Sequence, residues 1–375
     1  MEREARRLPG ALAGHRPRRQ PHRRDDRHPQ PDGLEPILTS AAPLRLGLSL
    51  SNEVPVADTV AIATRAEQLG LAEVWLPESR HGRGVFSVAG LVAAATRRIR
   101  IGIGIVNPFW RHPSVIAMEA AALDEASGGR VLLGVGAALW TLRALGEADR
   151  RADRPLTAMV EALRVLRALL HGDAGVDGDV FPVRADASLD FPVGRRIPIY
   201  VGAVNAGMLR ASGRWADGVE LGAIISPGYV RWSWERIVEG AQEGGRDPSA
   251  LDLAGNVLLS VDDDATAARD AVRYVLAYYT GRVEPIVLST SGADPDDVQR
   301  VREVAAARGP DAAAELVTDG MIDAFAAAGD VAHVAARLRA YADAGLRGLN
   351  AWHVIGPRPD QALRALAEEV WPCAR

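Results

Sequence analysis

The stretch IRIGIGIVNPFWRHPSVIAMEAAALDEASGGRVLLGVG, residues 99–136, decides the fold. It opens with an aliphatic run at 99–106 and closes with another at 130–136. The segment between them, 112–127, has the length and composition of a helix, and Pro113 stands in its first turn, where proline is favoured. A strand, a helix and a second strand in this order predict a parallel βαβ unit.

The same alternation continues along the chain and predicts eight parallel strands. The other expected strands are 44–50, 73–77, 197–202, 218–222, 251–261 and 349–354. Further helices are expected at 56–70, 87–96 and 154–172. Eight such strands predict a closed (β/α)8 barrel, the TIM barrel. An open dinucleotide-binding sheet is disfavoured because no G-x-G-x-x-G follows the first strand.

Two segments are longer than an ordinary βα loop, 173–196 and 262–329, and the second contains helical patterns of its own. Insertions in a barrel usually lie at its C-terminal mouth, where they shape the pocket. We therefore expect both insertions there, with substrate selection as their role. The alternative is that they are neutral surface insertions.

The chain divides into a tail, 1–42, and a barrel domain, 43–375. The tail is rich in arginine and proline and has no apolar run, so we expect it to be disordered. Its nine arginines are diluted by six acids and no aromatic residue lies among them, which argues against nucleic-acid binding. The remaining 35 arginines and 42 acids leave the body at −7, which also disfavours that partner.

Composition excludes several kinds of chemistry. All 44 basic residues are arginine, so neither a Schiff base nor a Walker-type phosphate lysine is available. Cys373 is the single cysteine, which excludes an internal disulfide and a thiolate metal cluster. No H-x-H pair occurs, and strand four ends in Gly136 and Ala137 where a glycosidase would need a carboxylate. We expect no metal.

The apolar runs are too short to cross a membrane. A soluble protein of the reducing cytoplasm is therefore the expectation, with no membrane partner.

Aromatic side chains are expected around the mouth of the barrel, just past the strand ends, where they would suit a planar heteroaromatic ligand. The expected substrate-pocket residues are Phe109, Trp110, Trp140 and Trp352. The alternative is that they are ordinary core residues that cap the barrel.

Several motifs in order resemble the luciferase-like monooxygenase superfamily. They are EQLGLAEVWLPESR at 67–80, GIGIVNPFWRHPSVIAMEAAALDEASGGRVLLGVGA at 102–137, PIYVGAVNAGMLRASGRWADGVELGAIISP at 198–227 and AAAGDVAHVAARLRAYADAGLRGLNAW at 326–352. The resemblance is greatest to the coenzyme F420-dependent oxidoreductase branch, which contains methylenetetrahydromethanopterin reductase. It covers essentially residues 44–357.

The resemblance implies a bacterial luciferase-like barrel that binds coenzyme F420, a deazaflavin, and transfers a hydride to or from a small organic substrate at a CH-NH or CH-OH group. It implies a non-prolyl cis peptide at Gly104-Ile105, behind the cofactor ring. It also implies a phosphate-binding turn after strand five. The implied cofactor-binding residues are Gly104, Ile105, Val106, Asn107, Gly136, Gly202, Ala203, Val204, Asn205, Ala206, Gly207 and Met208.

The catalytic candidates are Glu78, His81 and His112. The family commonly places an acid at the position of Glu78, where it would face the reactive ring and relay a proton. The alternative is a solvated loop acid paired with Arg80. His112 precedes a helix start, so a structural role is the alternative for that residue.

Other functions stay open at this point. Val204 and Asn205 depart from the family's usual arginine-glycine-proline turn, so flavin mononucleotide is the alternative cofactor, in a monooxygenase that uses O2. A catalytically silent flavin-binding barrel is a further alternative.

A homodimer is expected because dimers are common in the superfamily. The small-residue face of the 112–127 helix, Ala117, Ala120, Ala121 and Ala122, would then pack against the partner, or instead against its own barrel.

Overall fold

The computed structural model describes residues 42–51, 53–78, 82–139, 153–175, 177–184, 186–222, 224–352 and 355–375. Residues 1–41 of the expected tail lie outside the described residues. The prediction that the tail is disordered therefore also lies outside them.

Nine strands are present among these residues. They are β1 (Arg45–Ser49), β2 (Glu73–Leu76), β3 (Arg100–Val106), β4 (Val131–Val135), β5 (Ile199–Gly202), β6 (Gly218–Leu221), β7 (Asp252–Val261), β8 (Ala326–Gly329) and β9 (Gly348–Trp352).

Helices follow the strands. They are α1 (Val56–Gln68), α2 (Val85–Ala95), α3 (Pro113–Ser127), α5 (Pro155–His171), α6 (Ala206–Trp215), α7 (Pro227–Glu243), α8 (Ala265–Thr280), α9 (Pro285–Ser289), α10 (Pro295–Arg308), α11 (Pro310–Ala314), α12 (Asp319–Phe325), α13 (Val331–Asp343), α14 (Pro359–Ala365) and α15 (Trp371–Ala374). A short 3-10 turn (Pro248–Ala250) precedes β7, and a π-helical turn (Leu366–Val370) joins α14 to α15.

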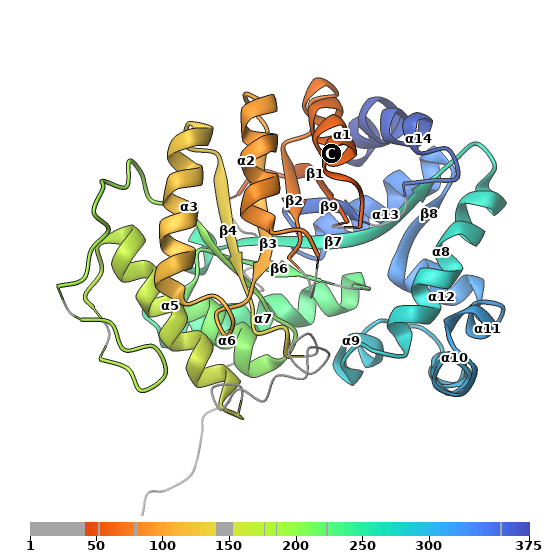
Figure 1. Ribbon diagram of the computed structural model, residues 1–375. Helices are drawn as coiled ribbons and strands as arrows, with labels where there is room; N and C mark the ends of the chain where they lie inside the picture. The colour runs from red at the N-terminus through yellow and green to blue at the C-terminus, as the bar shows by residue number, and fades with distance from the viewer. Residues whose placement is uncertain are drawn as a thin grey trace, which may run out of the picture. The chain divides into compact units, whose positions relative to one another are not determined.

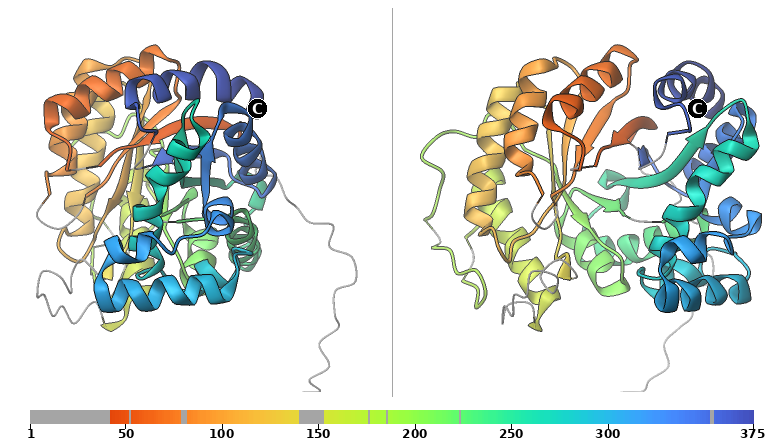
Figure 2. Two further views of the ribbon diagram at one scale, coloured as in Figure 1. Left: turned by 90° about the vertical axis from the view of Figure 1, so that its right-hand side faces the viewer. Right: turned by 45° about the vertical axis from the view of Figure 1, so that its right-hand side comes forward.

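The strands form the closed parallel barrel that the sequence predicts. Each strand from β1 to β7 pairs in parallel with the next, and β9 closes the ring between β7 and β1. The helices lie outside this ring, as Figures 1 and 2 show for α1, α2, α3 and α5. The fold is therefore a (β/α)8 barrel.

The strand β8 was not expected. It lies inside the 262–329 insertion and pairs with the C-terminal end of β7, from Leu258 to Val261. Its sequence, AAAG, has no β-branched or aromatic residue, so composition alone gives no strand signal there. The pairing arises because β7 is ten residues long and extends past its partner β6.

The helix boundaries follow from capping chemistry. Pro113 begins α3 and Pro155 begins α5, where the missing N–H costs nothing. Both helices end at a glycine with positive φ, Gly128 at 73° and Gly172 at 74°, a conformation that favours glycine. These predicted starts and stops are confirmed.

An ionic network fills the N-terminal end of the barrel. Arg45 donates to Glu73 at 3.2 Å and to Asp252, and Arg100 pairs with the same Glu73. The hydroxyl of Tyr200 donates to Asp252 at 2.5 Å. Each charge of this network therefore has a partner of opposite sign, as buried charges require.

Above this network a layer of side chains fills the barrel: Trp75, Leu132, Tyr200 and Ala254. The ring of Trp75 fits because Gly102 faces it, where a Cβ would lie only 2.2 Å from the ring. Side chains thus fill the barrel interior at the level of this layer. Of the described helices, none is both long and apolar enough to cross a membrane.

Candidate active site

A flat apolar platform lies at the end of β3. The peptide between Gly104 and Ile105 is cis, as predicted, and the register with β4 shifts between Ile103 and Val106. Gly104 and Ile105 are both partly exposed, whereas their flanking residues are buried. The side chain of Ile105 lies over glycines of neighbouring strands: a Cβ on Gly136 would be 1.9 Å, and one on Gly202 3.0 Å, from its Cδ1. Because these glycines have no side chain, Ile105 can lie flat across the mouth.

Asn107 fixes the loop that follows the platform. Its Nδ2 donates to the carbonyl of Ala137 at 2.6 Å, and its Oδ1 accepts from the backbone N–H of Phe109 at 2.8 Å. Asn107 is 1% exposed and Val106 0%. Both residues therefore support the loop from beneath, and Phe109, 3% exposed, belongs to the hydrophobic core.

The turn after β5 ends in an open helix start. Asn205 caps α6, since its Oδ1 accepts from the N–H of Met208 at 3.0 Å. The hydroxyl of Tyr229 donates to the carbonyl of Val204 at 2.8 Å, which fixes the turn to α7. The first-turn N–H groups of Ala206 and Gly207 have no acceptor within the helix. An anion such as a phosphate fits this position, with Ala203 and Met208 buried behind it.

Glu78 faces a basic partner from the next loop. Its Oε1 accepts from Arg111 at 2.7 Å, and its Oε2 accepts from the indole of Trp110 at 3.3 Å. Arg111 also pairs with Glu119 at 2.9 Å. Burial lowers the pKa of Arg111, but the hydrogen bonds and charges of both carboxylates outweigh burial and raise it. Arg111 thus joins Glu78 and Glu119 in one ion-pair cluster. Arg80, the expected partner of Glu78, lies outside the described residues, as does His81.

His112 makes the contacts of a helix cap. Its Nδ1 accepts from the N–H of Ser114 at 3.2 Å at the start of α3. Its ring contacts Phe181 edge-on, with ring centroids 5.6 Å apart. Phe181 belongs to the 173–196 insertion, so that insertion also reaches the loops at the mouth. The structural alternative for His112 is the one that these contacts favour.

The second insertion, 262–329, contributes a wall of the mouth. Tyr279, at the end of α8, packs against Trp352 at the end of β9, with ring centroids 5.0 Å apart. Trp352 is half-buried at the mouth, where the sequence placed it, whereas Trp140 lies outside the described residues. Gly228, at the start of α7, lies so near Thr290 of the insertion that a Cβ would be 2.0 Å from its carbonyl oxygen. The second insertion is therefore at the C-terminal mouth, as predicted, whereas the first runs from the end of α5 to the start of β5 and reaches the mouth through Phe181.

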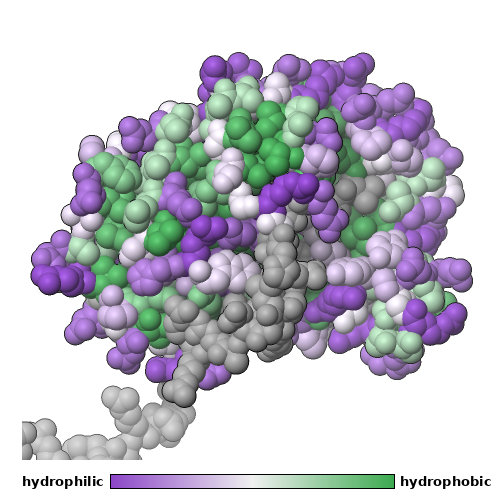
Figure 3. Space-filling view, viewed as in Figure 1, coloured by the Kyte–Doolittle hydropathy of each residue, from purple (hydrophilic) through white to green (hydrophobic). Residues whose placement is uncertain are grey.

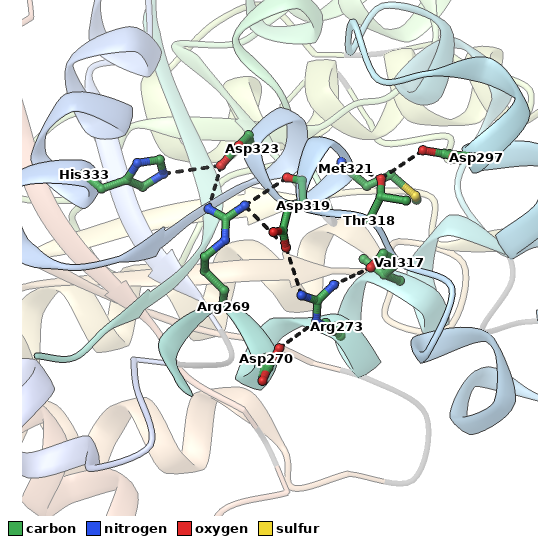
Figure 4. Close-up of polar contacts among 10 residues, drawn as sticks. All are labelled: Arg269, Asp270, Arg273, Asp297, Val317, Thr318, Asp319, Met321, Asp323 and His333. Carbon is green, nitrogen blue, oxygen red and sulfur yellow. Dashed lines mark hydrogen bonds and ion pairs between the residues drawn. The ribbon is translucent and has the colours of Figure 1, made fainter. Parts of the chain in front are cut away.

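Ion pairs join two helices of the second insertion, α8 and α12, to each other and to α13 (Figure 4). Arg269 of α8 pairs with Asp323 of α12 at 2.7 Å, and Arg273 with Asp319 at 2.9 Å. Asp323 also meets His333 of α13 at 3.4 Å. Burial raises the pKa of Asp323, but the hydrogen bond from Arg269 and the neighbouring positive charges outweigh burial and lower it. The network therefore holds α8, α12 and α13 together.

A buried carboxyl that the sequence analysis did not single out lies beneath the platform. Glu220 of β6 is 4% exposed, and its Oε2 lies 2.8 Å from the place of a Cβ on Gly104. Its Oε1 accepts from the Nδ2 of Asn256 on β7 at 3.3 Å. Burial, together with the charge of Glu73, raises the pKa of Glu220 to about 8, against the lowering effect of Asn256. The signal in the sequence was an acid within the short buried strand GVEL.

These features define a class of protein. They combine a closed parallel barrel, a cis-peptide bulge at the mouth, an open helix start for an anion and two insertions around the opening, as in barrels that bind a flavin-type cofactor. No group of three or more potential metal ligands is found among the described residues. The chain belongs to the luciferase-like monooxygenase family, whose model matches residues 38–348.

Relatives narrow the position within this family. The 5,10-methylenetetrahydromethanopterin reductase of Methanolobus tindarius is 31% identical over 87% of this chain and 99% of its own length. The F420-dependent glucose-6-phosphate dehydrogenase of Amycolatopsis mediterranei is 27% identical over 85% of this chain and 94% of its own. The solved structure of the coenzyme F420-dependent tetrahydromethanopterin reductase of Methanopyrus kandleri has a TM-score of 0.79 at 27% identity, covering 89% of this chain and all of that one.

Proposed function

We propose that this protein is an oxidoreductase that transfers a hydride between coenzyme F420 and a small organic substrate. The observation that carries the proposal is the platform of Ile105 over Gly136 and Gly202, beside the open start of α6. A planar ring fits the first feature and a phosphate the second. The names of the relatives support F420 over other ring cofactors.

The residues of the chain would divide the work of binding. The ring would rest on Ile105, the phosphate would accept from Ala206 and Gly207, and Trp352 with Tyr279 would wall the substrate side. When bound, the cofactor supplies or accepts the hydride. The protein's contribution is orientation in a site from which the two insertions exclude water, so no triad or metal is needed.

A flavin-dependent monooxygenase is the second candidate. The observation in its favour is the Val204-Asn205 turn, which departs from the usual phosphate motif of the F420 branch. The two functions differ in their use of oxygen, because a monooxygenase consumes O2 with reduced flavin and a hydride-transfer enzyme does not.

An assay of turnover separates them. Reduced F420 would be mixed with the enzyme and a panel of imine and carbonyl acceptors under nitrogen, and its reoxidation followed by absorbance. We expect acceptor-dependent reoxidation, and no O2 uptake with reduced flavin mononucleotide. O2 uptake with the flavin, without F420 turnover on any acceptor, would contradict the proposal.

A homodimer through α2 and α3 is part of the same proposal. Of the four alanines expected at the interface, Ala117, Ala120 and Ala121 are buried against the protein's own barrel. The exposed apolar side chains are instead Leu91 at 52%, Val115 at 41% and Met118 at 52%, together with exposed Ala122. Figure 3 shows apolar residues gathered over these two helices. An apolar face of this kind suits a second copy of the chain.

Two further statements remain proposals. We assign the catalytic role to one domain, 43–375, which agrees with the compact unit Leu38–Arg375. We place the protein in the cytoplasm, because its one cysteine, Cys373, is free and exposed.

A further inference from the structure

The side chains of Glu220 and Asn256 meet inside the barrel, at the floor of the mouth. Inward-facing positions alternate along β7: Asp252 bonds to Tyr200 in the lower network, Ala254 packs in the layer above, and Asn256 comes next toward the mouth. Asn256 is accordingly half-exposed, whereas Glu220 lies deeper. The Glu220 carboxyl reaches from β6 to Gly104 on β3, directly beneath the platform.

The hydrogen bonding of this pair is incomplete. The Oδ1 of Asn256 is buried and has no hydrogen-bond partner among the described residues. Glu220 accepts one bond from Asn256 and forms no ion pair with any described arginine or histidine. A buried polar atom without a partner destabilises a protein, so such atoms are commonly completed by a ligand or a proton.

We propose that Glu220 in its acid form sets the amide of Asn256 so that Asn256 donates a hydrogen bond to a carbonyl on the pyrimidine edge of the bound deazaflavin. The proposal rests on the function proposed above. Glu220 is a positioning residue and Asn256 a cofactor-binding residue.

The direction of the amide depends on the proton of Glu220. When the carboxyl carries its proton, the Asn256 amide turns over from its orientation in the structure, so that the O–H of Glu220 donates to Oδ1. Nδ2 then takes the buried position that Oδ1 now occupies, where a ring carbonyl can accept from it. When the carboxyl is ionised, it accepts a hydrogen bond from Nδ2, and Oδ1 remains without a donor. A carbonyl oxygen of the ring is then left facing an acceptor, which weakens binding.

The surroundings of Glu220 favour the protonated form. On β2, Glu73 faces it from below and is itself paired with Arg45 and Arg100. Asn256 on β7 and Gly104 on β3 bring no charge. With burial and a neighbouring carboxylate both opposing ionisation, Glu220 holds its proton at neutral pH.

Fluorescence titration of the full chain with oxidised F420, from about pH 6.5 to about 9, tests the proposal. For the wild type we expect the Kd to rise at least about tenfold as pH increases through the titration of Glu220. Glu220→Gln should bind as tightly as the wild type at pH 7 and lose most of that rise, because a neutral amide can still donate to Oδ1. Asn256→Ala should bind about tenfold more weakly across the range. Glu119→Gln is the matched control, and its pH profile should follow the wild type.

An infrared titration of the free protein gives a readout without cofactor. The carbonyl band of a protonated carboxylic acid should persist at neutral pH, vanish at higher pH and be absent from Glu220→Gln. Equal pH profiles for wild type and Glu220→Gln, or unchanged binding by Asn256→Ala, would overturn the inference while leaving the proposed function intact. A folded wild type that shows the band but binds no F420 would overturn both.

Discussion

At the scale of single residues, the site depends on glycines, which have no side chain, as much as on the side chains that line it. Gly136 and Gly202 make room for Ile105, and Gly104 makes room for the carboxyl of Glu220. A methyl group at Gly136 would meet the Cδ1 of Ile105, the tip of a side chain that can rotate away. Such a change should therefore alter the platform more than the stability of the barrel.

Gly136→Ala is expected to weaken F420 binding about tenfold and to change Tm by only about 1–3 °C. The reason is that Ile105 must leave its flat position to make room for the methyl group. Binding would be measured by fluorescence titration and Tm by calorimetry. Gly222→Ala is the control, because a Cβ there meets nothing within 4 Å. Unchanged F420 binding by a Gly136→Ala variant would contradict the role of the platform.

Glu220 also predicts a pH dependence of stability. Its pKa is about 8 in the folded chain and 4.5 ordinarily, so the unfolded chain ionises first as pH rises. Folding stability from this group is therefore fully present below about pH 4.5 and is lost progressively toward about pH 8. Glu220→Gln should match the wild type in Tm near pH 4.5 and exceed it by roughly 5 °C near pH 8.5. Parallel Tm curves for the two proteins would show that Glu220 ionises as an ordinary acid.

These residues also mark the limit of sequence reasoning. The cis peptide at Gly104-Ile105 could be predicted because family motifs cover it. Glu220 could not be assigned, because which face of β6 points inward depends on how the barrel closes. Glu78 follows β2, and its partner, Arg111, comes from another loop. Sequence spacing gives no information on that contact.

At the scale of elements, helix ends could be predicted where proline or glycine marks them. Proline and glycine fixed the ends of α3 and α5, while β8 has only alanine and glycine and exists through its pairing with β7. The second insertion is held by the ion-pair network of α8, α12 and α13 together with the pairing of β8 to β7. Removal of one charge from this network should therefore loosen the contact between α8 and α12.

Arg269→Met tests this anchoring. The variant loses the contact with Asp323 at 2.7 Å and the bond to the carbonyl of Asp319 at 3.1 Å. Hydrogen exchange in α12 should quicken about tenfold, while exchange in β1 to β6 stays unchanged. Arg300→Met is the control, since the Arg300 side chain is 56% exposed and pairs with Asp297 of its own helix. An equal effect from both variants would show that the network does not anchor the insertion.

At the scale of the whole molecule, the barrel presents two distinct surfaces: a mouth lined by the insertions and an apolar face over α2 and α3. The (β/α)8 architecture was predictable because eight strand signals recur in order. Of the two alternatives for the alanines of α3, packing against their own barrel holds for Ala117, Ala120 and Ala121. The exposed Val115 and Met118 lie on the other side of the same helix. Only the packing of α3 against the barrel determines which of these residues are buried and which are exposed.

Met118→Glu should convert a dimer to a monomer, because it places a charge in the centre of the apolar face. Sedimentation velocity at micromolar concentration would measure the change, with the far-UV spectrum as a check of folding. Tyr274→Glu, at another exposed apolar side chain with 47% exposure, should leave the oligomeric state unchanged. A wild type that sediments as a monomer would contradict the proposed interface.

The central claim is that this barrel is built for a deazaflavin, and one measurement tests it most directly. Purified protein would be titrated anaerobically with oxidised coenzyme F420 and, separately, with flavin mononucleotide, and the cofactor's fluorescence followed. We predict saturable binding of F420 at least about tenfold tighter than binding of the flavin. Preferential binding of flavin mononucleotide would contradict the account and favour the monooxygenase, and binding of neither cofactor would point to a silent barrel.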